Sequence, residues 1–428
     1  MPYSPRSPRR RTALHLRLLL LGLAIVVPLA VVELLLQAMP RLLPTWFRTQ
    51  FPPNGIEFLQ PGVLDRTAIT AVPLPFPADP YSGPPPHDLV DHGVAPAAAA
   101  AADLAQVPNI VLPVDTEGMP NPSTLPAQAP VVLIGDSFCV YGSQQEPAGL
   151  LATLTSQLGV GVRNVSVSGI GPDQELFLLE HVALPCQPRL VVWMFFGGND
   201  FVDAFWSQVH RAQGVRTLAD LYQGRRVPTL YLPTLLARLF TASPAKAVTT
   251  PLPPFTLTSD PTRPVWFFPD TLRAMSLPAK DVAENPGWFG ITTALRAAKA
   301  RCATSGARLL VVYLPSKEQV YLPRVDADAP RLQRFALASS LLGVPLPPTA
   351  DEVQSQLLAN RAVLEGLLTE FCRTEELAFW SATPTIEAVA DQGIPAYYTT
   401  DTHWRAESQR AVAKALAEHV VARNLLPR

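Results

Sequence analysis

Five short apolar runs, separated by stretches of helical pattern, constrain the fold of this chain more than any other feature. Continuous apolar runs bounded by turn residues are typical of strands buried on both faces of a parallel sheet. The runs span residues 130–134, 163–167, 189–196, 307–314 and 377–382, and helices are expected at about 147–158, 173–183, 290–304, 352–374 and 405–423. The pattern predicts an α/β domain over residues 129–425, with a five-stranded parallel sheet and an insertion at 204–285.

The first 40 residues predict on which side of a membrane the rest of the chain lies. Arginines at positions 6, 9, 10, 11 and 17 precede an uncharged run, and apolar character continues past Glu33 to Met39. As a helix, residues 18–39 would be about 33 Å long, enough for a hydrocarbon core of roughly 30 Å. The basic tail is expected to stay in the cytoplasm and the rest of this single-pass chain to lie outside, in the periplasm or at the cell surface. A cleaved signal peptide is the alternative, but no small-x-small cleavage site follows, which favours a signal anchor at 1–40.

Residues 41–128, rich in proline and alanine, are expected to form a stalk and lead-in, partly ordered against the domain.

The composition and motifs of the chain exclude several classes of partner and cofactor. Lys and Arg number 34 against 35 Asp and Glu, so the basic surplus of a nucleic-acid binder is missing. Zinc, phosphate-loop and dinucleotide motifs are missing as well, so neither a metal nor a cofactor is expected.

The cysteines are too few for a disulfide framework. Cys139 is expected to pack in the core, because cysteine is among the most buried residue types. Cys302 and Cys372 each lie in a predicted helix just before a strand, and their pairing in an oxidising compartment is left open.

Polar residues that follow the predicted strands supply the parts of a nucleophilic site. In an open parallel sheet, ligands bind outside the carboxyl ends of the strands. Ser137 follows the first strand and is the candidate nucleophile; His403 is the candidate base, and Asp401 would orient the imidazole. The backbone N–H groups of Ser137 and Gly169 and the side-chain amide of Asn199 are the candidate oxyanion-hole donors.

Neighbouring residues admit plainer interpretations. Asp136 and Asp200 are expected to be structural hydrogen-bonding residues of their turns rather than catalytic acids. For Asp401 the alternative is a capping role at the last helix. Lys317 and Tyr321, after the fourth strand, either line an acyl or sugar site or brace their loop.

Aromatic residues are further candidates for contact with substrate. Trp404 directly follows His403 and is a candidate substrate-lining residue. A second group, in and near the insertion, either stacks on sugars or belongs to the core; its members are Phe205, Trp206, Trp266, Phe267, Phe268 and Trp288.

The ordered set of Gly-Asp-Ser, a mid-chain glycine, Gly-x-Asn-Asp and a C-terminal Asp/His pair resembles the SGNH (GDSL-like) hydrolase superfamily over roughly residues 110–425. The resemblance implies a flavodoxin-like three-layer sandwich. It also implies that Ser137, Gly169, Asn199 and His403 are the four name-giving residues, with Asp401 as the third triad member.

Two departures distinguish this chain from common members of that superfamily. Only Thr402 separates Asp401 from His403, where common members have two residues. The Asp-x-His-Trp motif, together with Pro-Ser-Lys-Glu-Gln-Val-Tyr at 315–321, is closer to the branch with alginate O-acetyltransferases and related exopolysaccharide-modifying proteins. In many of those proteins the Asp-His motif precedes the Gly-Asp-Ser motif, whereas here it follows.

The resemblance and the N-terminus together suggest a membrane-anchored ester hydrolase with an acyl-serine intermediate, acting on acylated carbohydrate. An O-acetyltransferase of cell-surface polysaccharide is the first alternative, because the same triad serves both acceptors. A non-catalytic scaffold for polysaccharide assembly is the second. The expected partners are the acyl ester, which could belong to a polysaccharide, and a membrane bound through the N-terminal helix; no nucleic acid is expected.

Overall fold

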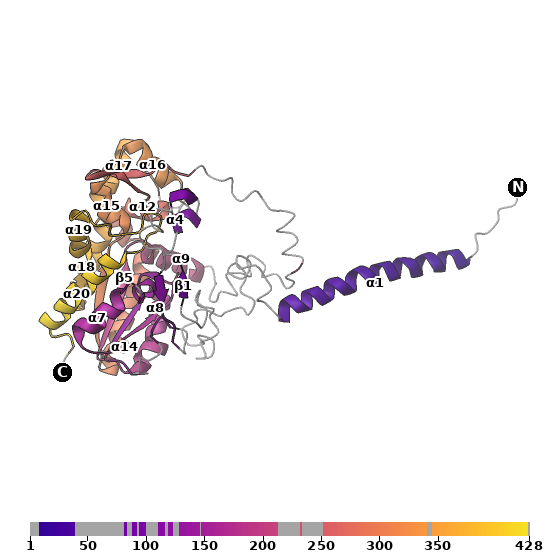
Figure 1. The fold of residues 1–428 in the computed structure, drawn as a ribbon, viewed down its shortest axis with the longest axis horizontal. Helices are drawn as coiled ribbons and strands as arrows, with labels where there is room; N and C mark the ends of the chain where they lie inside the picture. Colours follow the sequence, from indigo (N-terminus) through magenta and orange to yellow (C-terminus); the bar gives the residue numbers. More distant parts are fainter. Residues whose placement is uncertain are drawn as a thin grey trace. The chain divides into compact units, whose positions relative to one another are not determined.

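The computed structural model describes residues 8–38, 81–83, 88–91, 94–99, 110–115, 119–122, 128–145, 147–212, 232, 251–339 and 345–426. The chain divides into two compact units (Figure 1). One comprises residues 1–60 and 215–247, and the other comprises residues 61–214 and 248–428. Of the predicted insertion at 204–285, the structure describes residues 204–212, 232 and 251–285.

A five-stranded parallel sheet forms the centre of the second unit, as predicted. Its strands are β3 (Val131–Gly135), β4 (Val162–Ser166), β5 (Leu190–Phe196), β8 (Arg308–Leu314) and β9 (Ala378–Ser381). They lie in the order β4-β3-β5-β8-β9, and every neighbouring pair is parallel. In chain order this is 2-1-3-4-5, the order of flavodoxin-like sheets.

Helices cover both faces of this sheet. On one side, α20 (Ala406–Ala422) contacts both α7 (Leu150–Leu158) and α19 (Thr383–Asp391). On the other side lie three helices that contact one another: α8 (Pro172–Leu178), α9 (Asp200–Ala212) and α14 (Pro286–Ser305). Successive side chains of a strand point to opposite faces. Accordingly, Met194 of β5 belongs to the core cluster with Leu154 and Leu416 of α7 and α20, while its neighbour Trp193 bonds Glu175 of α8.

Further elements surround the sheet and its covering helices. They are α4 (Asp88–Asp91), η2 (Ala97–Ala99), α6 (Ser137–Gly142), η3 (Leu179–Ala183), η4 (Leu184–Cys186), β6 (Phe255–Leu257), β7 (Asp260–Val265), α12 (Pro269–Met275), α13 (Ala279–Ala283), α15 (Lys317–Tyr321), η5 (Leu322–Arg324), α16 (Ala329–Leu337), α17 (Ala350–Asn360) and α18 (Val363–Thr374). The single helix predicted at 352–374 is therefore two helices, α17 and α18.

The first unit contains α1 (Pro8–Ala38), where the sequence predicts a membrane-spanning helix. Within the part of the chain that the structure describes, no helix has both the length and the apolar character that a membrane crossing requires. The helix expected there is present, and its crossing of a membrane is not shown.

Part of the predicted lead-in covers the edge of the sheet. β2 (Ile110–Leu112) pairs antiparallel with β1 (Tyr81–Gly83), and the chain then reaches Asn121, which is fully buried. The Asn121 side chain donates to the carbonyl of Asn164 (2.8 Å) and accepts from its N–H (2.7 Å). Asn164 lies in β4, the first strand in the sheet order, so one side-chain amide satisfies two backbone groups that an edge strand otherwise leaves unpaired.

Replacing Asn121 by alanine leaves these two buried groups without their partner. We expect Asn121→Ala to lower the free energy of unfolding by about 1–3 kcal/mol, measured by urea denaturation. Gln128→Ala is the control, since this exposed amide bonds only another exposed glutamine among the described contacts, and we expect a change within about 0.5 kcal/mol. Equal losses in both variants would contradict the edge-covering role.

Candidate active site

A buried Asp–His pair lies in the loop before α20. The Nδ1 atom of His403 is 2.6 Å from Oδ1 of Asp401, and the same oxygen accepts the backbone N–H of His403 at 2.7 Å. Asp401 is 0% exposed and His403 is 2% exposed. The N-cap of α20 is Arg405, so Asp401 does not cap that helix. Its carboxylate instead holds the imidazole, which is what a base in acyl transfer needs.

The His403 ring packs against the short helix that begins with Ser137. The ring centroid lies 4.8 Å from that of Phe138 and 4.5 Å from that of Tyr141, both residues of α6. Burial raises the pKa of Asp136, directly before this helix, and the nearby His403 opposes that increase electrostatically. The turn after β3 and the loop before α20, far apart in the sequence, therefore meet at one site.

The Gly-Asp-Ser turn presents its serine and buries its aspartate. Asp136 accepts the backbone N–H of Phe138 at 2.9 Å and so caps α6, the structural role predicted for it. The Ser137 hydroxyl lies 3.4 Å from the second oxygen of Asp136, a long contact that leaves the hydroxyl weakly held. Ser137 itself is partly exposed, whereas Asp136 is fully buried.

Gly169 follows β4 and takes a conformation that favours glycine. Its φ of 73° lies in the left-handed region, where a Cβ would be strained. The residue is exposed, and no described atom lies within 4 Å of the place that a Cβ would occupy. The space in front of its backbone is therefore clear for a ligand to approach.

Asn199 follows β5, and a carboxylate orients its side chain. Its Nδ2 donates to Oδ2 of Asp203 at 2.8 Å, one helical turn further along. Its side chain also interacts with Asp136 and opposes the increase that burial causes in the pKa of that carboxyl. Ser137, Gly169 and Asn199 thus follow three neighbouring strands, at the carboxyl edge where a parallel sheet binds ligands.

Four carboxyl groups lie close together beneath this edge. Burial is the largest effect on each and raises the pKa values of Asp136, Glu175, Asp200 and Asp203. Repulsion between these carboxylates raises the pKa values of Glu175, Asp200 and Asp203 further. For Glu175 and Asp200 the increase is large, and for Asp203 the pKa rises to about 7. These carboxyls therefore keep their protons to higher pH than ordinary carboxyls do, which reduces the negative charge next to the candidate oxyanion hole.

Two of these carboxyls also hold the surrounding structure. Asp200 accepts the backbone N–H of Phe196 at 2.7 Å, which fixes the turn after β5 as predicted for it. Glu175 accepts the indole N–H of Trp193 at 2.6 Å and ties α8 to the sheet.

Asp203 gives a pH test of this electrostatic environment. Its folded pKa of about 7 exceeds the ordinary value of 3.8, so the unfolded state ionises first and stability is lost as pH rises from about 4 to 7. Asp203→Asn removes this loss. We expect the free energy of unfolding of the variant, relative to the natural protein, to rise by about 4 kcal/mol between pH 4 and pH 8 in urea denaturation.

Asp260 supplies the control of opposite sign. Hydrogen bonds from Thr262 lower the pKa of this exposed carboxyl, so its contribution to stability is lost as pH falls. For Asp260→Asn the same comparison should move the other way. A difference between Asp203→Asn and the natural protein that does not vary with pH would contradict the raised pKa.

Lys317 braces the loop that carries the Asp–His pair. Its side chain is 1% exposed, and Nζ donates to the carbonyls of Tyr398 (2.9 Å) and Thr399 (3.1 Å). Tyr321 accepts the backbone N–H of Ala396 at 2.9 Å through its hydroxyl oxygen. Both therefore hold the loop before α20 rather than their own loop after β8, and both also border a cavity beside the loop that they hold.

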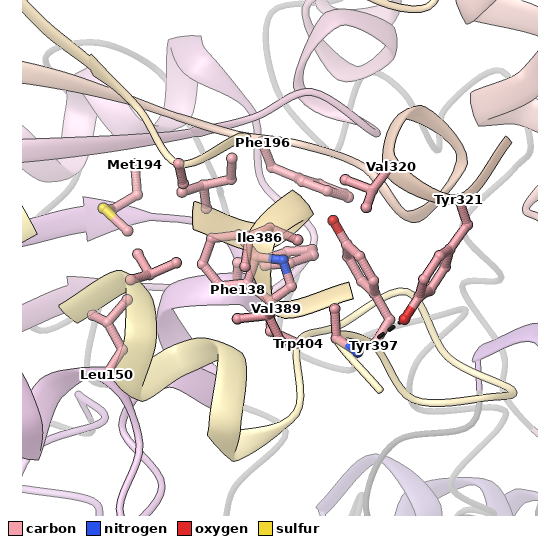
Figure 2. Close-up of a cluster of buried hydrophobic side chains, with 14 of the residues drawn as sticks. Phe138, Leu150, Met194, Phe196, Val320, Tyr321, Ile386, Val389, Tyr397 and Trp404 are labelled. Atoms are coloured by element: carbon pink, nitrogen blue, oxygen red, sulfur yellow. Dashed lines mark hydrogen bonds between the residues drawn. The ribbon is translucent and has the colours of Figure 1, made fainter. Parts of the chain in front are cut away.

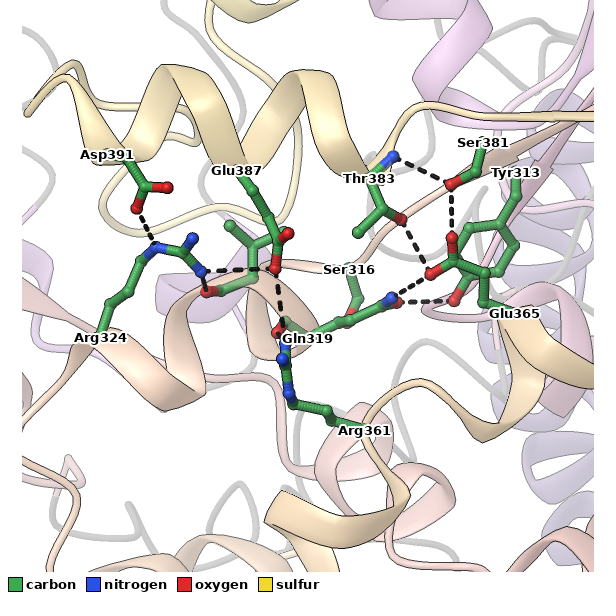
Figure 3. Close-up of polar contacts among 11 residues, drawn as sticks. Tyr313, Ser316, Gln319, Arg324, Arg361, Glu365, Ser381, Thr383, Glu387 and Asp391 are labelled. Atoms are coloured by element: carbon green, nitrogen blue, oxygen red, sulfur yellow. Dashed lines mark hydrogen bonds and ion pairs between the residues drawn. The ribbon is translucent and has the colours of Figure 1, made fainter.

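A polar network anchors the helix that carries Lys317 (Figure 3). Gln319 of α15 donates to Glu365 of α18 at 2.6 Å and accepts from the hydroxyl of Tyr313 at 2.7 Å. Glu365 also accepts from Ser381 and Thr383, at the end of β9 and the start of α19. Two helices, α18 and α19, and the ends of β8 and β9 thus hold α15 in place.

Trp404 packs into the core. Figure 2 shows it among apolar side chains, and it is 2% exposed, with its ring centroid 5.3 Å from that of Phe138. Of the aromatic residues in and near the insertion, Trp266 and Phe267 are also buried, whereas Trp206 is 41% exposed. The first two therefore belong to the core and not to a sugar-stacking surface.

Three cysteines with predicted roles are buried in the structure. Cys139 is buried, as predicted. Cys302 and Cys372 are both free and buried, so the disulfide left open between them is not formed. Burial raises the pKa of each of these two thiols to about 12, which makes them inert.

Sequence reasoning missed two residues that shape the site. Asp203 orients Asn199. The sequence could have indicated this contact, because Asp203 lies four residues after Asn199 and side chains at that spacing on a helix are neighbours. Tyr141 contacts the His403 ring from α6, and nothing in the sequence pattern indicated that a residue so distant in the chain would do so.

Comparisons with known proteins yield structural neighbours only. Neither a family model nor a curated protein matches this chain. Among solved structures, it is similar to a GDSL-like lipase from Bacteroides thetaiotaomicron, with 11% identity, a TM-score of 0.30, and coverage of 69% of this chain and 88% of that one. It is also similar to phospholipase A1 from Streptomyces albidoflavus, with 11% identity, a TM-score of 0.35, and coverage of 68% and 99%. Since both TM-scores are below 0.5, the activity of this chain is inferred from its own residues.

Proposed function

We propose that this chain is a serine ester hydrolase of the SGNH type. Ser137 attacks the ester carbonyl, and His403 takes the hydroxyl proton through Nε2. The tetrahedral oxyanion is stabilised by the N–H groups of Ser137 and Gly169 and by the Asn199 amide. When it collapses, the C–O bond to the alcohol breaks and His403 returns the proton to the leaving oxygen. Water then hydrolyses the acyl-serine by the same steps.

The buried Asp401–His403 pair, packed on the helix that starts with Ser137, is the observation that carries the proposal. An Asp accepting the Nδ1–H sets the tautomer in which Nε2 is the basic nitrogen. The pair is buried, whereas Ser137 and Asn199 are partly exposed and Gly169 is exposed. This combination suits a reaction on an incoming ester.

The proposal extends to an acylated carbohydrate as substrate and to anchoring of the enzyme in a membrane through residues 18–39, on the outer side. The arginines before this segment support the orientation, and the likeness of residues 315–321 and 401–404 to exopolysaccharide-modifying proteins supports the substrate class. Transfer of the acyl group to a sugar hydroxyl instead of water uses the same intermediate.

Hydrolysis of 4-nitrophenyl acetate by the full chain tests the nucleophile. We expect Ser137→Ala to reduce kcat by at least about 10³-fold, because no acyl-enzyme forms without the hydroxyl. A fluorophosphonate probe should label the natural protein at Ser137, with loss of fluoride. Ser305→Ala, at the exposed end of α14, should keep full activity. Equal rates for Ser137→Ala and the natural protein would leave only a non-catalytic scaffold.

The oxyanion role of Asn199 has its own test. We expect Asn199→Ala to lower kcat about 10²–10³-fold with little change in KM, since the amide acts mainly in the transition state. Thermal unfolding should be measured on the same variant, to separate lost catalysis from lost folding. An unchanged kcat would remove Asn199 from the oxyanion hole.

A further inference from the structure

The helix that begins with the candidate nucleophile also carries a partly exposed aromatic ring. Tyr141 belongs to α6 and lies four positions after Ser137. Side chains at this spacing are neighbours on a helix, with Cβ atoms about 5–6 Å apart. The ring centroid of Tyr141 is also 4.5 Å from that of His403. The phenol ring therefore lies beside both the candidate nucleophile and the candidate base.

The lead-in before the sheet holds this ring in place. Tyr141 packs against a small buried cluster that includes Ile110 and Leu112 of β2. Just beyond α6, the N–H of Gln145 donates to the carbonyl of Val111 at 2.7 Å, which ties the end of the helix to the same strand. The position of the ring is thus fixed by packing and by a hydrogen bond, as a residue that recognises a ligand requires.

Contact with His403 puts the ring on the alcohol side of the ester. In the hydrolysis proposed above, His403 returns its proton to the leaving oxygen, so the alcohol part of the ester lies against the imidazole. Since the ring of Tyr141 contacts the same imidazole, it borders the alcohol part as well. The steps proposed for hydrolysis give this ring no role.

The other exposed groups of the candidate site are polar. Ser137 and Asn199 are partly exposed and Gly169 is exposed, whereas the neighbouring rings of Phe138 and Trp404 are buried. One aromatic ring among hydroxyl, amide and peptide groups suits an alcohol that has both an apolar face and hydroxyl groups, as a sugar ring does. A plain alkyl alcohol would cover polar groups that it cannot bond, which costs free energy.

From this arrangement we propose that Tyr141 contacts the substrate, binds the sugar ring on the alcohol side of the ester, and so determines which alcohol is released. The proposal rests on the ester hydrolysis proposed above, and it adds the residue that recognises the alcohol. Tyrosine suits this role because its ring is rigid and amphipathic and loses little conformational entropy on binding.

Three acetate esters that differ only in their alcohol test the contact. They are methyl glucoside acetylated at its primary hydroxyl, hexyl acetate and ethyl acetate. Each releases a primary alcohol and leaves the same acetyl-serine, so a difference between them reports on the alcohol side. We expect kcat/KM of the full chain for the sugar ester to exceed that for each alkyl ester about tenfold or more, measured as acetate release. Equal values for the three esters, or a preference for hexyl acetate, would overturn the proposal.

Variants assign the preference to the ring. Tyr141→Leu keeps an apolar side chain against the lead-in and removes the ring, so kcat/KM should fall about tenfold for the sugar ester and stay within about threefold for ethyl acetate. Tyr141→Phe keeps the ring and should keep the preference. Phe289→Ala removes an exposed ring on α14 and should change neither ester. If Tyr141→Leu lowers both esters equally, or neither, the ring does not contact the sugar.

Binding of methyl glucoside gives a second measurement, which relies neither on hydrolysis nor on the folding of a variant. In saturation-transfer NMR of the natural full chain, irradiation of aromatic protons should transfer saturation to the C–H protons of the sugar. Tyr141→Leu should weaken the binding about tenfold, and Phe289→Ala should not weaken it. Absence of transfer in the natural protein would overturn the proposal, even where Tyr141→Leu fails to fold.

The two proposals fail separately. Sugar binding that depends on Tyr141, with no hydrolysis of 4-nitrophenyl acetate, would refute the esterase and leave the sugar contact. Hydrolysis that depends on Ser137, with no preference among the three acetate esters, would refute the sugar contact and leave the esterase.

Discussion

The contact between the His403 ring and the helix that begins at Ser137 joins two ends of the domain that the chain separates by most of its length. Phe138 and Tyr141 hold the ring from one side, and Asp401 holds its Nδ1 from the other. The two segments that supply these contacts are themselves held in place by hydrogen bonds. α6 is capped by Asp136, and the Asp401 loop is held by the Lys317 ammonium. Because every link is buried or bonded, the imidazole has little freedom to leave the serine turn.

The fold was largely predictable, because its strands are buried on both faces. Each of the five apolar runs became a strand within about two residues, since continuous burial needs continuous apolar sequence. The helical pattern was less informative. The predicted helix at 352–374 breaks around Arg361, where neither glycine nor proline signals an end. The helix α19 was not predicted, although the proline in its first turn is an ordinary signal of a helix start.

The candidate site was predictable where residues follow strands directly, and not where contacts join distant segments. Ser137, Gly169 and Asn199 could be placed from the topology, because parallel strands bring their carboxyl ends to one edge. The bracing role of Lys317 depends on its distance from the Tyr398 carbonyl, which no local pattern encodes. The raised pKa of Asp203 likewise arises from burial beside other carboxyls, a property of the assembled fold.

The amide of Asn121 has a consequence for how copies of this protein meet. A bare edge strand is a template on which another chain can add a strand, and such addition leads to domain swapping or fibrils. At Asn164 the hydrogen-bonding groups of β4 are already occupied by a side chain that projects from a different part of the same molecule. A second sheet therefore cannot continue through this position without first expelling Asn121, so self-association by strand addition is opposed at that edge.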